Sequence, residues 1–336
     1  MEEILEPARP ICDPHHHLWD HPGRRYLLDE LLADTGSGHN VRATVFVECR
    51  SMYRAHGPLA LRPVGETEFV NGIAAMSASG RYGSAEVAAG IVSFADLTLA
   101  EGAGEVLDAH IAASSRFRGI RHAAGWDASP DIRNSHTDPP PGLLGDRRFR
   151  RGFAELARRG LTFDAWCYHP QLPEVAELAK TFPDTTIVLD HFGGPLGIGP
   201  YRGRRAEVFA WWRDAIRAVA HCPNVVAKLG GLVMPLNGFG FHKRADPVTS
   251  AELAEATRAW YLHAIDCFGV QRCMFESNFP VDKASVSYRV LWNSFKRIAG
   301  GFSGDEKAAL FHDTAAKVYG LRPMEYPVAH QRRTVA

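Results

Sequence analysis

A short stretch near the start of the chain, ICDPHHHLWD, constrains the fold and the chemistry more than any other. Ile11 and Cys12 are typical of a β-strand, and side chains two positions apart in an extended chain point to the same side. We therefore expect His15 and His17 to direct two imidazoles at a common point, and His16 to face the other way. This arrangement suits two nitrogen ligands of one metal ion, or two groups that hydrogen-bond one substrate oxygen. A solvated turn is the alternative for this stretch taken alone.

The rest of the chain alternates regularly between strand-like and helix-like segments. Further strands are predicted at residues 41–49, 87–97, 117–123, 161–168, 185–193, 224–231 and 272–280. Helices are predicted at about 66–79, up to 113, and at 148–159, 172–182, 205–221, 249–268, 285–299 and 304–319. Eight strand-helix units in succession predict a closed parallel (β/α)8 barrel, that is, a TIM barrel. A doubly wound open sheet is the alternative, but no Gly-x-Gly-x-x-Gly follows the first strand.

Composition sets the class of protein. The chain has 38 Lys and Arg against 38 Asp and Glu, so no net charge attracts nucleic acid or an anionic membrane surface. No apolar run approaches the ~18 residues of a membrane span, and the first residues lack signal-peptide features. Six cysteines without Cys-x-x-Cys spacing favour reduced thiols and a cytoplasmic location. We expect one barrel domain over residues 1–336, with its core at about 10–321 and a loose tail at 323–336.

The loops that follow strands are longer than those that follow helices. The strand-to-helix loops cover residues 50–65, 125–146, 194–204 and 232–247, whereas Gly160 alone precedes the fifth strand. A barrel of this kind builds its active site from the strand-to-helix loops. The histidines at strand ends or in these loops are His15, His17, His56, His122, His136, His169, His191 and His242. We therefore expect the site on this face, with a small molecule as substrate and His122 among the residues that bind it.

Five motifs, in this order, resemble those of the amidohydrolase superfamily. They are DPHHHLWD, GIRH on the fourth strand, FDAWCYHPQLPEVAELA in the fifth unit, LDHFGGP on the sixth strand and MFESNFPVD on the eighth. More narrowly, they look like the amidohydrolase-related (amidohydrolase 2) branch, similar to 2-pyrone-4,6-dicarboxylate lactonase and sugar-lactone hydrolases. The resemblance spans about residues 10–321 and implies a TIM barrel of the metal-dependent-hydrolase type.

The resemblance implies roles for individual residues. His15 and His17 match the first-strand pair that binds metal or substrate, and His191 matches the sixth-strand histidine that binds metal or polarises the substrate carbonyl. His169 occupies the place of a further ligand or substrate contact. Arg121 matches a fourth-strand arginine that pairs with substrate oxygen or carboxylate in the lactonases. The fourth strand lacks the lysine whose carbamylated form bridges two metals in other members, so we expect at most one divalent ion of the zinc type, or none.

The eighth strand departs from the family pattern at its catalytic position. The aspartate that serves the family as general base is Asn278 here, and an amide has no useful basicity at neutral pH. Glu276 shares the face of Asn278 but is expected one layer deeper in the barrel. Its favoured interpretation is a buried partner of a cation such as Lys228. Lys228 itself would meet an anionic substrate or form a buried ion pair.

Other acidic residues and one histidine are weighed as replacement bases. His191 would serve without a metal, because a free imidazole titrates near neutrality. Glu48, at the end of the second strand, would reach the substrate or pair with a neighbouring arginine. Asp282 can equally cap the last barrel helix, and Asp190 is expected to face outward by strand parity. Asp13 is expected to orient an imidazole.

These observations predict a hydrolase that opens a lactone of a small carboxylic or sugar acid. The catalytic candidates are His191, Asn278, Arg121 and Glu276, and the substrate-binding candidates are His169, Glu48, Lys228 and His122. The metal candidates are His15, His17 and His191. Two alternatives stay open: a decarboxylase or hydratase of an aromatic or dienoic acid, and a barrel that binds a ligand without catalysis. The oligomeric state also stays open, with a homo-oligomer as one alternative.

Overall fold

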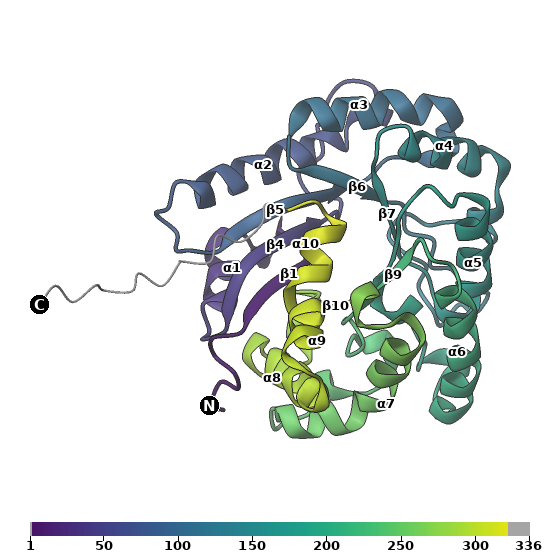
Figure 1. Ribbon diagram of the computed structural model, residues 1–336. Coiled ribbons are helices and arrows are strands. Elements are labelled where there is room, and N and C mark those ends of the chain that lie inside the picture. The colour runs from purple at the N-terminus through teal and green to yellow at the C-terminus, as the bar shows by residue number, and fades with distance from the viewer. Residues whose placement is uncertain (1, 322–336) are drawn as a thin grey trace, which may run out of the picture.

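Eight parallel strands follow one another around a barrel in the computed structural model, which describes residues 2–321 (Figure 1). In sheet order they are β1 (Pro10–His16), β4 (Asn40–Val47), β5 (Glu86–Ser93), β6 (Phe117–Arg121), β7 (Thr162–Ala165), β8 (Ile187–Leu189), β9 (Val225–Leu229) and β10 (Cys273–Phe275). The predicted TIM barrel is confirmed. The tail predicted at 323–336 lies outside the described residues.

Helices cover the outside of the sheet, one after each strand from β4 onward (Figure 1). They are α2 (Val64–Ala78), α3 (Ala103–Ala113), α4 (Arg147–Ala157), α5 (Leu172–Thr181), α6 (Arg205–Ala220), α7 (Ser250–Phe268) and α8 (Tyr288–Ile298). Local sequence fixes their starts: the side chain of Asp146 caps α4, and Thr249 forms a capping box with Glu252 at the start of α7. Strands β7 and β8 end sooner than predicted, because the chain turns there into the strand-to-helix loops at the carboxyl ends of the strands.

The barrel closes through a narrow contact between its first and last strands. His16 bridges Phe279 in parallel register, the N–H of His17 donates to the carbonyl of Phe279 at 2.8 Å, and the N–H of Asn278 donates to the carbonyl of His15 at 3.0 Å. These bonds all lie at the carboxyl ends of the two strands. The closure of the sheet therefore brings the histidine stretch of β1 directly against the segment that follows β10.

The last helical segments of the described residues fill the seam below this contact. These segments are α9 (Gly304–Ala308), a π-helical turn (Ala309–Asp313) and α10 (Thr314–Val318), and they lie between β1 and β10 (Figure 1). Tyr319, which follows α10, is fully buried and donates its hydroxyl to Asp164 of β7 at 2.8 Å. The predicted helix over 304–319 therefore closes the bottom of the barrel, as expected, and also reaches its interior.

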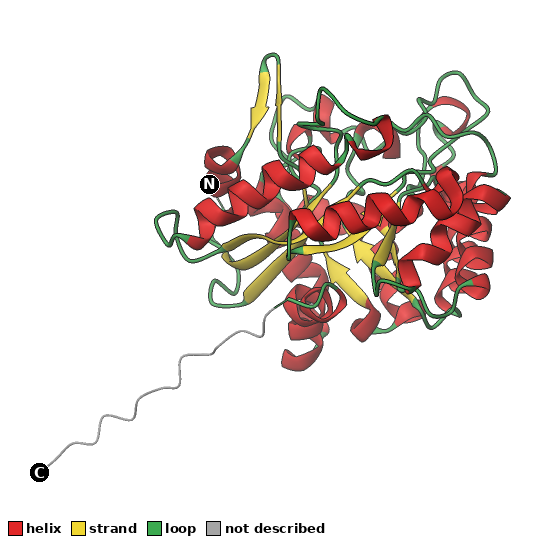
Figure 2. Cartoon of the chain, turned by 90° about the horizontal axis from the view of Figure 1, so that it is seen from above, coloured by secondary structure: helices red, strands yellow, loops and turns green. Residues whose placement is uncertain are grey.

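One part of the fold has no counterpart in the sequence-based prediction. Between β1 and β4 the chain forms an antiparallel hairpin, β2 (Trp19–His21) with β3 (Arg24–Tyr26), and a helix, α1 (Leu28–Thr35). The hairpin stands out from the body of the barrel in the second view (Figure 2). Pro22 and Gly23 supply the turn, a signal the sequence carried. Among the described residues, no helix is both long and apolar enough to cross a bilayer.

The packing of the seam predicts where the fold is sensitive. Phe311 is 1% exposed, and its ring centroid lies 4.8 Å from that of Phe275 on β10. Replacing Phe311 by Ala should lower the free energy of unfolding by about 3–5 kcal/mol, because the substitution would leave a cavity in a well-packed aromatic cluster. Ile111→Ala, at a residue that is 44% exposed, should change it by less than about 0.5 kcal/mol. Urea denaturation of both variants tests this, and equal losses would contradict the role given to the seam.

Candidate active site

A cavity of about 460 Å³ opens at the carboxyl ends of the strands, among the long loops. Its polar lining includes His17, Arg121, Arg133, His136, His191 and Asn278. Its apolar lining includes Trp19, Trp166, Ile198, Met234, Leu236 and Val281. The face predicted from loop length is thus the face that carries a cavity.

Three imidazoles cluster at this end of the barrel: His17 and His191 line the cavity, and His15 lies behind them. The ring centroid of His15 lies 5.0 Å from that of His17 and 4.4 Å from that of His191. The ring of His16 points away from the other two, and its Nε2 lies 2.9 Å from the hydroxyl oxygen of Thr44. The Nδ1–H of His17 donates to the carbonyl of Val47 at 2.8 Å, which leaves Nε2 of His17 as an acceptor at the cavity. Burial, followed by the positive charge of Arg121, lowers the pKa of His17 well below its usual value, so this ring is neutral.

Glu276 joins two of the imidazoles from beneath. Its Oε1 lies 2.5 Å from Nδ1 of His191, and its Oε2 lies 2.9 Å from Nδ1 of His15. Burial alone would raise the pKa of Glu276, but the two imidazoles outweigh burial and lower it to about 2. The ionised carboxylate accepts the Nδ1–H of His191 and so leaves Nε2 of that ring unprotonated for the cavity. The expected pairing of Glu276 with Lys228 is therefore replaced by a pairing with histidine.

Two glycines after β9 make room for this pair. A Cβ on Gly230 would lie 2.4 Å from Cγ of Glu276, and a Cβ on Gly231 would lie 2.3 Å from Nδ1 of His191. Gly231 also has a φ of +66°, which other residues adopt only with strain. The Gly-Gly pair is a sequence signal for the site that pattern reasoning overlooked.

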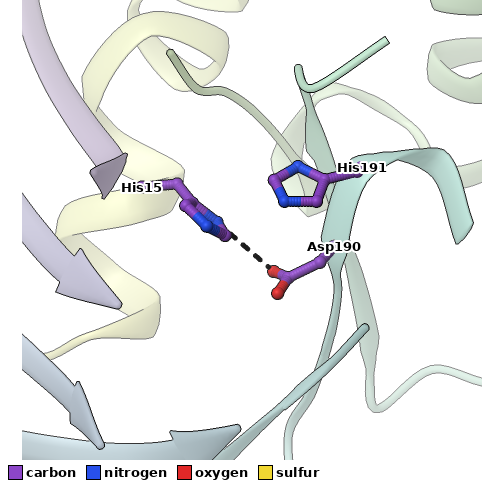
Figure 3. A group of neighbouring side chains, drawn as sticks. All are labelled: His15, Asp190 and His191. Carbon is purple, nitrogen blue, oxygen red and sulfur yellow. Dashed lines mark ion pairs between the residues drawn. The ribbon is translucent and has the colours of Figure 1, made fainter. Parts of the chain in front are cut away.

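Asp190 faces the interior, against the prediction that it points outward. It is fully buried, and its Oδ1 lies 3.7 Å from Nδ1 of His15 (Figure 3). The parity argument fails because β8 ends at Leu189, and the next turn has left-handed φ values of 52° at His191 and 58° at Phe192. Such strained residues gather at functional sites. The turn directs the adjacent side chains of Asp190 and His191 into the same space.

A lysine lies under the imidazoles and holds two carboxylates. Nζ of Lys228 is 2.5 Å from Oδ2 of Asp164 and 3.2 Å from Oδ1 of Asp190, and it is fully buried. It also lies 3.3 Å from Nδ1 of His15. Burial raises the pKa of Asp164 to about 6 in spite of this lysine. Lys228 thus takes the buried-ion-pair role rather than a place on the cavity wall.

Arg121 reaches the cavity from β6 and is held by Glu48. Its Nε donates to Oε1 of Glu48 at 2.7 Å, and its Nη2 donates to the carbonyl of Glu48 at 2.6 Å. Nη1 lies 3.5 Å from Asp190 and 3.4 Å from Nε2 of His15. The other carboxylate oxygen of Glu48 lies 3.0 Å from Nε2 of His136. Glu48 therefore orients a cation at the cavity floor and is not itself part of the cavity lining.

Asn278 is fixed at the cavity edge by hydrogen bonding and by an unusual backbone. Its φ is 55°, and its Nδ2 donates to Oδ1 of Asp282 at 3.1 Å, which leaves Oδ1 of the amide as an acceptor at the cavity. Burial raises the pKa of Asp282 well above its usual value. Asp282 does not cap α8, because Ser287 has that role. The amide is therefore placed to orient a substrate or a water rather than to take a proton.

Asp13 ties the two ends of the barrel together. Its Oδ1 accepts the backbone N–H of Ser277 at 2.9 Å, and its Oδ2 accepts the hydroxyl of Tyr288 at 3.0 Å. Burial raises the pKa of Asp13 to about 6. We expected this carboxylate to orient an imidazole, but its bonds hold the segment after β10 in place instead.

Two predicted substrate contacts lie away from the central cavity. Nδ1 of His122 accepts the N–H of Leu97 at 3.3 Å, and His122 lines a separate cavity of about 250 Å³. Nδ1 of His169 accepts the N–H of Leu196 at 3.3 Å, and the ring of His169 packs 5.0 Å from that of Tyr201. Burial lowers the pKa of each imidazole to about 4. Both histidines hold loops in place, and neither lines the cavity above His191.

One group of side chains has the composition of a metal site. Ligand atoms of His15, Asp190 and His191 all lie within 4.8 Å of one another (Figure 3). Two imidazoles and a carboxylate form a common zinc ligand set. The carboxylate oxygens of Asp190 are buried without a hydrogen bond of good geometry, although Nζ of Lys228 lies 3.2 Å from Oδ1. These oxygens fit one divalent cation. A second ion would meet the positive charges of Arg121 and Lys228.

Comparisons with known proteins agree on the family. A family model described as amidohydrolase matches residues 12–321. The chain is 35% identical to the uncharacterized protein y4mH of Sinorhizobium fredii, over 92% of this chain and 98% of that one. It is 29% identical to an L-fucono-1,5-lactonase of Burkholderia multivorans, over 92% and 95% of the two chains. A crystal structure of an amidohydrolase from Burkholderia multivorans with bound zinc is 26% identical, with a TM-score of 0.70 over 93% and 99% of the chains.

The pairing of Glu48 with Arg121 predicts a pH-dependent stability. Burial opposes ionisation of Glu48, but His136 and Arg121 outweigh burial and lower its pKa to about 2. Its stabilising contribution is therefore present above its ordinary pKa of 4.5 and is lost as the pH falls through about 2. At pH 7, Glu48→Gln should lower the free energy of unfolding by about 3 kcal/mol, because it leaves Arg121 buried without its partner.

Urea denaturation between pH 3 and pH 7 measures this effect. The difference in the free energy of unfolding between wild type and Glu48→Gln should become smaller as the pH falls from 4.5 toward 3. Glu207→Gln removes an exposed pair with Arg204 and should lower the free energy of unfolding far less than Glu48→Gln does. A difference that stays constant across this pH range would show that the ion pair does not account for it.

Proposed function

Because the chain belongs to the amidohydrolase family, we propose that it is a hydrolase that opens a lactone, the cyclic ester of a small carboxylic or sugar acid. The observation that carries the proposal is the contact of Glu276 with Nδ1 of His191 at 2.5 Å, at the floor of a cavity that Arg121 also lines. This pair supplies a base where Asn278 cannot. Similarity to an L-fucono-1,5-lactonase supports the lactone as the substrate class.

The general base in this mechanism is the imidazole of His191. Glu276 accepts the Nδ1–H of His191, so Nε2 can take a proton from the attacking water. The carboxylate then stabilises the imidazolium that forms. Protonated His191 returns this proton to the ring oxygen as the C–O bond breaks. The products are a hydroxyl group and a carboxylic acid, and the acid releases a proton to solvent at neutral pH.

Arg121 stabilises the negative charge that develops on the carbonyl oxygen. Its guanidinium is held by Glu48 before substrate arrives, and such preorganised charge is usually the largest catalytic contribution. Nε2 of the neutral His17 and Oδ1 of Asn278 are acceptors for the hydrogen of the water that His191 does not take. His15 does not line the cavity, so its role is to fix the carboxylate of Glu276 through Nδ1.

The residues that would hold a metal ion are His15, Asp190 and His191. A divalent ion there would supply Lewis-acid activation in place of the imidazole base, because Glu276 holds Nδ1 of His191 and only Nε2 would be left to bind the ion. Arg121 lies against the same group and adds positive charge at the same place.

A weakly buffered pH-indicator assay against a panel of lactones and aromatic carboxylic acids tests the reaction class. The proposal predicts acidification on at least one lactone, because ring opening releases a proton. Alkalinisation on a carboxylic acid would instead indicate decarboxylation. Ligand binding without turnover, with turnover appearing only in Asn278→Asp, would favour a binding barrel that has lost its base.

Two variants test the role of the base. His191→Ala and Glu276→Gln should each lower kcat by about 10²–10⁴-fold, because both remove the base that Glu276 and His191 form together. The double variant should be no worse than His191→Ala alone, since the two groups act as a unit. His221→Ala, at the exposed end of α6, is the matched control and should retain full turnover. Near-normal turnover in His191→Ala with an unchanged circular dichroism spectrum would contradict the mechanism.

The donor set also predicts the stoichiometry of metal binding. Equilibrium dialysis against excess zinc should give no more than one equivalent per chain, because positive side chains lie where a second ion would bind. Asp190→Asn should weaken whatever binding is measured. Two equivalents, both lost in His15→Ala, would contradict this account of the site.

A further inference from the structure

We infer that the cavity selects a substrate that carries a carboxylate on a flat, largely apolar body, and that Arg133 is the residue that binds this carboxylate. The inference rests on the proposed function, because it names the substrate class of the same site. Arg133 lies in the loop between β6 and α4 and lines the cavity above the imidazoles. It has no part in the hydrolytic step described above.

The guanidinium of Arg133 has no partner of its own. Within residues 2–321 it forms no ion pair and donates no hydrogen bond, and its side chain is exposed at the cavity. Arg121, by contrast, is engaged by Glu48 through two donors. A planar guanidinium with free donors matches the two oxygens of a carboxylate. Arg133 is therefore the cation at this cavity that a carboxylate can meet without displacing an internal partner.

The backbone around Arg133 is held in place, so its charge is positioned. The carbonyl of Arg133 accepts the hydroxyl of Tyr168 at 2.5 Å, and the hydroxyl of Thr137 donates to the carbonyl of Ala123 at 2.6 Å. The N–H of Ser135 donates to the carbonyl of Gly125 at 2.8 Å. These bonds fix the loop on both sides of the arginine. A side chain on such a loop can bind with less loss of conformational freedom than one on a loose segment.

Another part of the wall is apolar and would receive the body of the substrate. Met234, Leu236 and Val281 line it, together with Ile198 and the ring of Trp166. These side chains belong to one packed cluster, so the wall is a continuous surface. Such a wall suits a flat, apolar ring and offers no hydrogen bond to a row of hydroxyl groups.

The lining also lacks the acidic groups that would bind a polyol. Among the described residues that line the cavity there is no aspartate or glutamate, and Asn134 and Asn278 are its side-chain amides. Vicinal hydroxyls donate hydrogen bonds, and ionised carboxylates are the strongest acceptors for them. A cavity with two guanidinium groups and no carboxylate therefore favours an anionic substrate over a neutral sugar lactone.

Calorimetric titration with benzoate and with benzyl alcohol tests this inference without any turnover. The two probes share a flat apolar ring, and only benzoate carries a carboxylate. Benzoate should bind at least about tenfold more tightly, a difference typical of one charge-assisted contact. In Arg133→Gln the ratio of the dissociation constant of benzyl alcohol to that of benzoate should fall to near one. Arg148→Gln, an exposed arginine on the outer helix α4, is the matched control and should keep the full ratio.

The outcomes separate this inference from the proposed function, because benzoate is not an ester and cannot be hydrolysed. Equal binding of the two probes, or a preference for benzoate that survives in Arg133→Gln, would overturn the role of Arg133. A preference for benzoate that depends on Arg133 supports it even if no lactone in the panel is opened. A failure to open any lactone would count against the proposed hydrolysis and not against the role of Arg133.

Discussion

The buried charge network at the carboxyl end of the barrel is the interaction on which the rest of the site depends. Four buried carboxylates, from Glu48, Asp164, Asp190 and Glu276, surround Lys228, which is fully buried, and Arg121, which meets the cavity. Unpaired charges in such a place cost several kcal/mol each, so every group must keep its partner. With neutral imidazoles the carboxylates outnumber the cations, so the charge balance of this space has room for one bound cation. The same network links the segment after α10 to the site, because Tyr319 donates a hydrogen bond to Asp164.

Sequence reasoning succeeded where regular geometry holds. The succession of strands and helices gave the barrel, and alternation within β1 separated His16 from its two neighbours. It failed where the backbone leaves regular geometry, since the left-handed turn after β8 directs Asp190 inward. Partners contributed by different strands were also beyond it, so Glu276 was matched with a lysine rather than with two histidines. No local pattern encodes such contacts, because they arise only when β8, β9 and β10 are brought side by side.

An asparagine at position 278, where the resemblance implies an aspartate, is compatible with catalysis. Proton transfer requires a base of suitable strength near the attacking water, and an imidazole supported by a carboxylate meets that requirement. In this chain the carboxylate comes from two residues before Asn278, and Gly230 and Gly231 provide the space that both side chains occupy. The amide then has a different task, because Asp282 fixes its orientation. In the proposed mechanism, Asn278 and Glu276 are therefore parts of one arrangement.

The central claim is that Glu276 holds His191 as a base with Nε2 free, and nitrogen NMR of the histidine side chains tests it without knowledge of the substrate. In protein labelled with ¹⁵N, the account predicts that His191 at neutral pH carries its proton on Nδ1, with Nε2 unprotonated. It also predicts that Glu276→Gln disturbs this signal and leaves that of His221 unchanged. A proton on Nε2 of His191 at neutral pH, unaffected by Glu276→Gln, would contradict the claim.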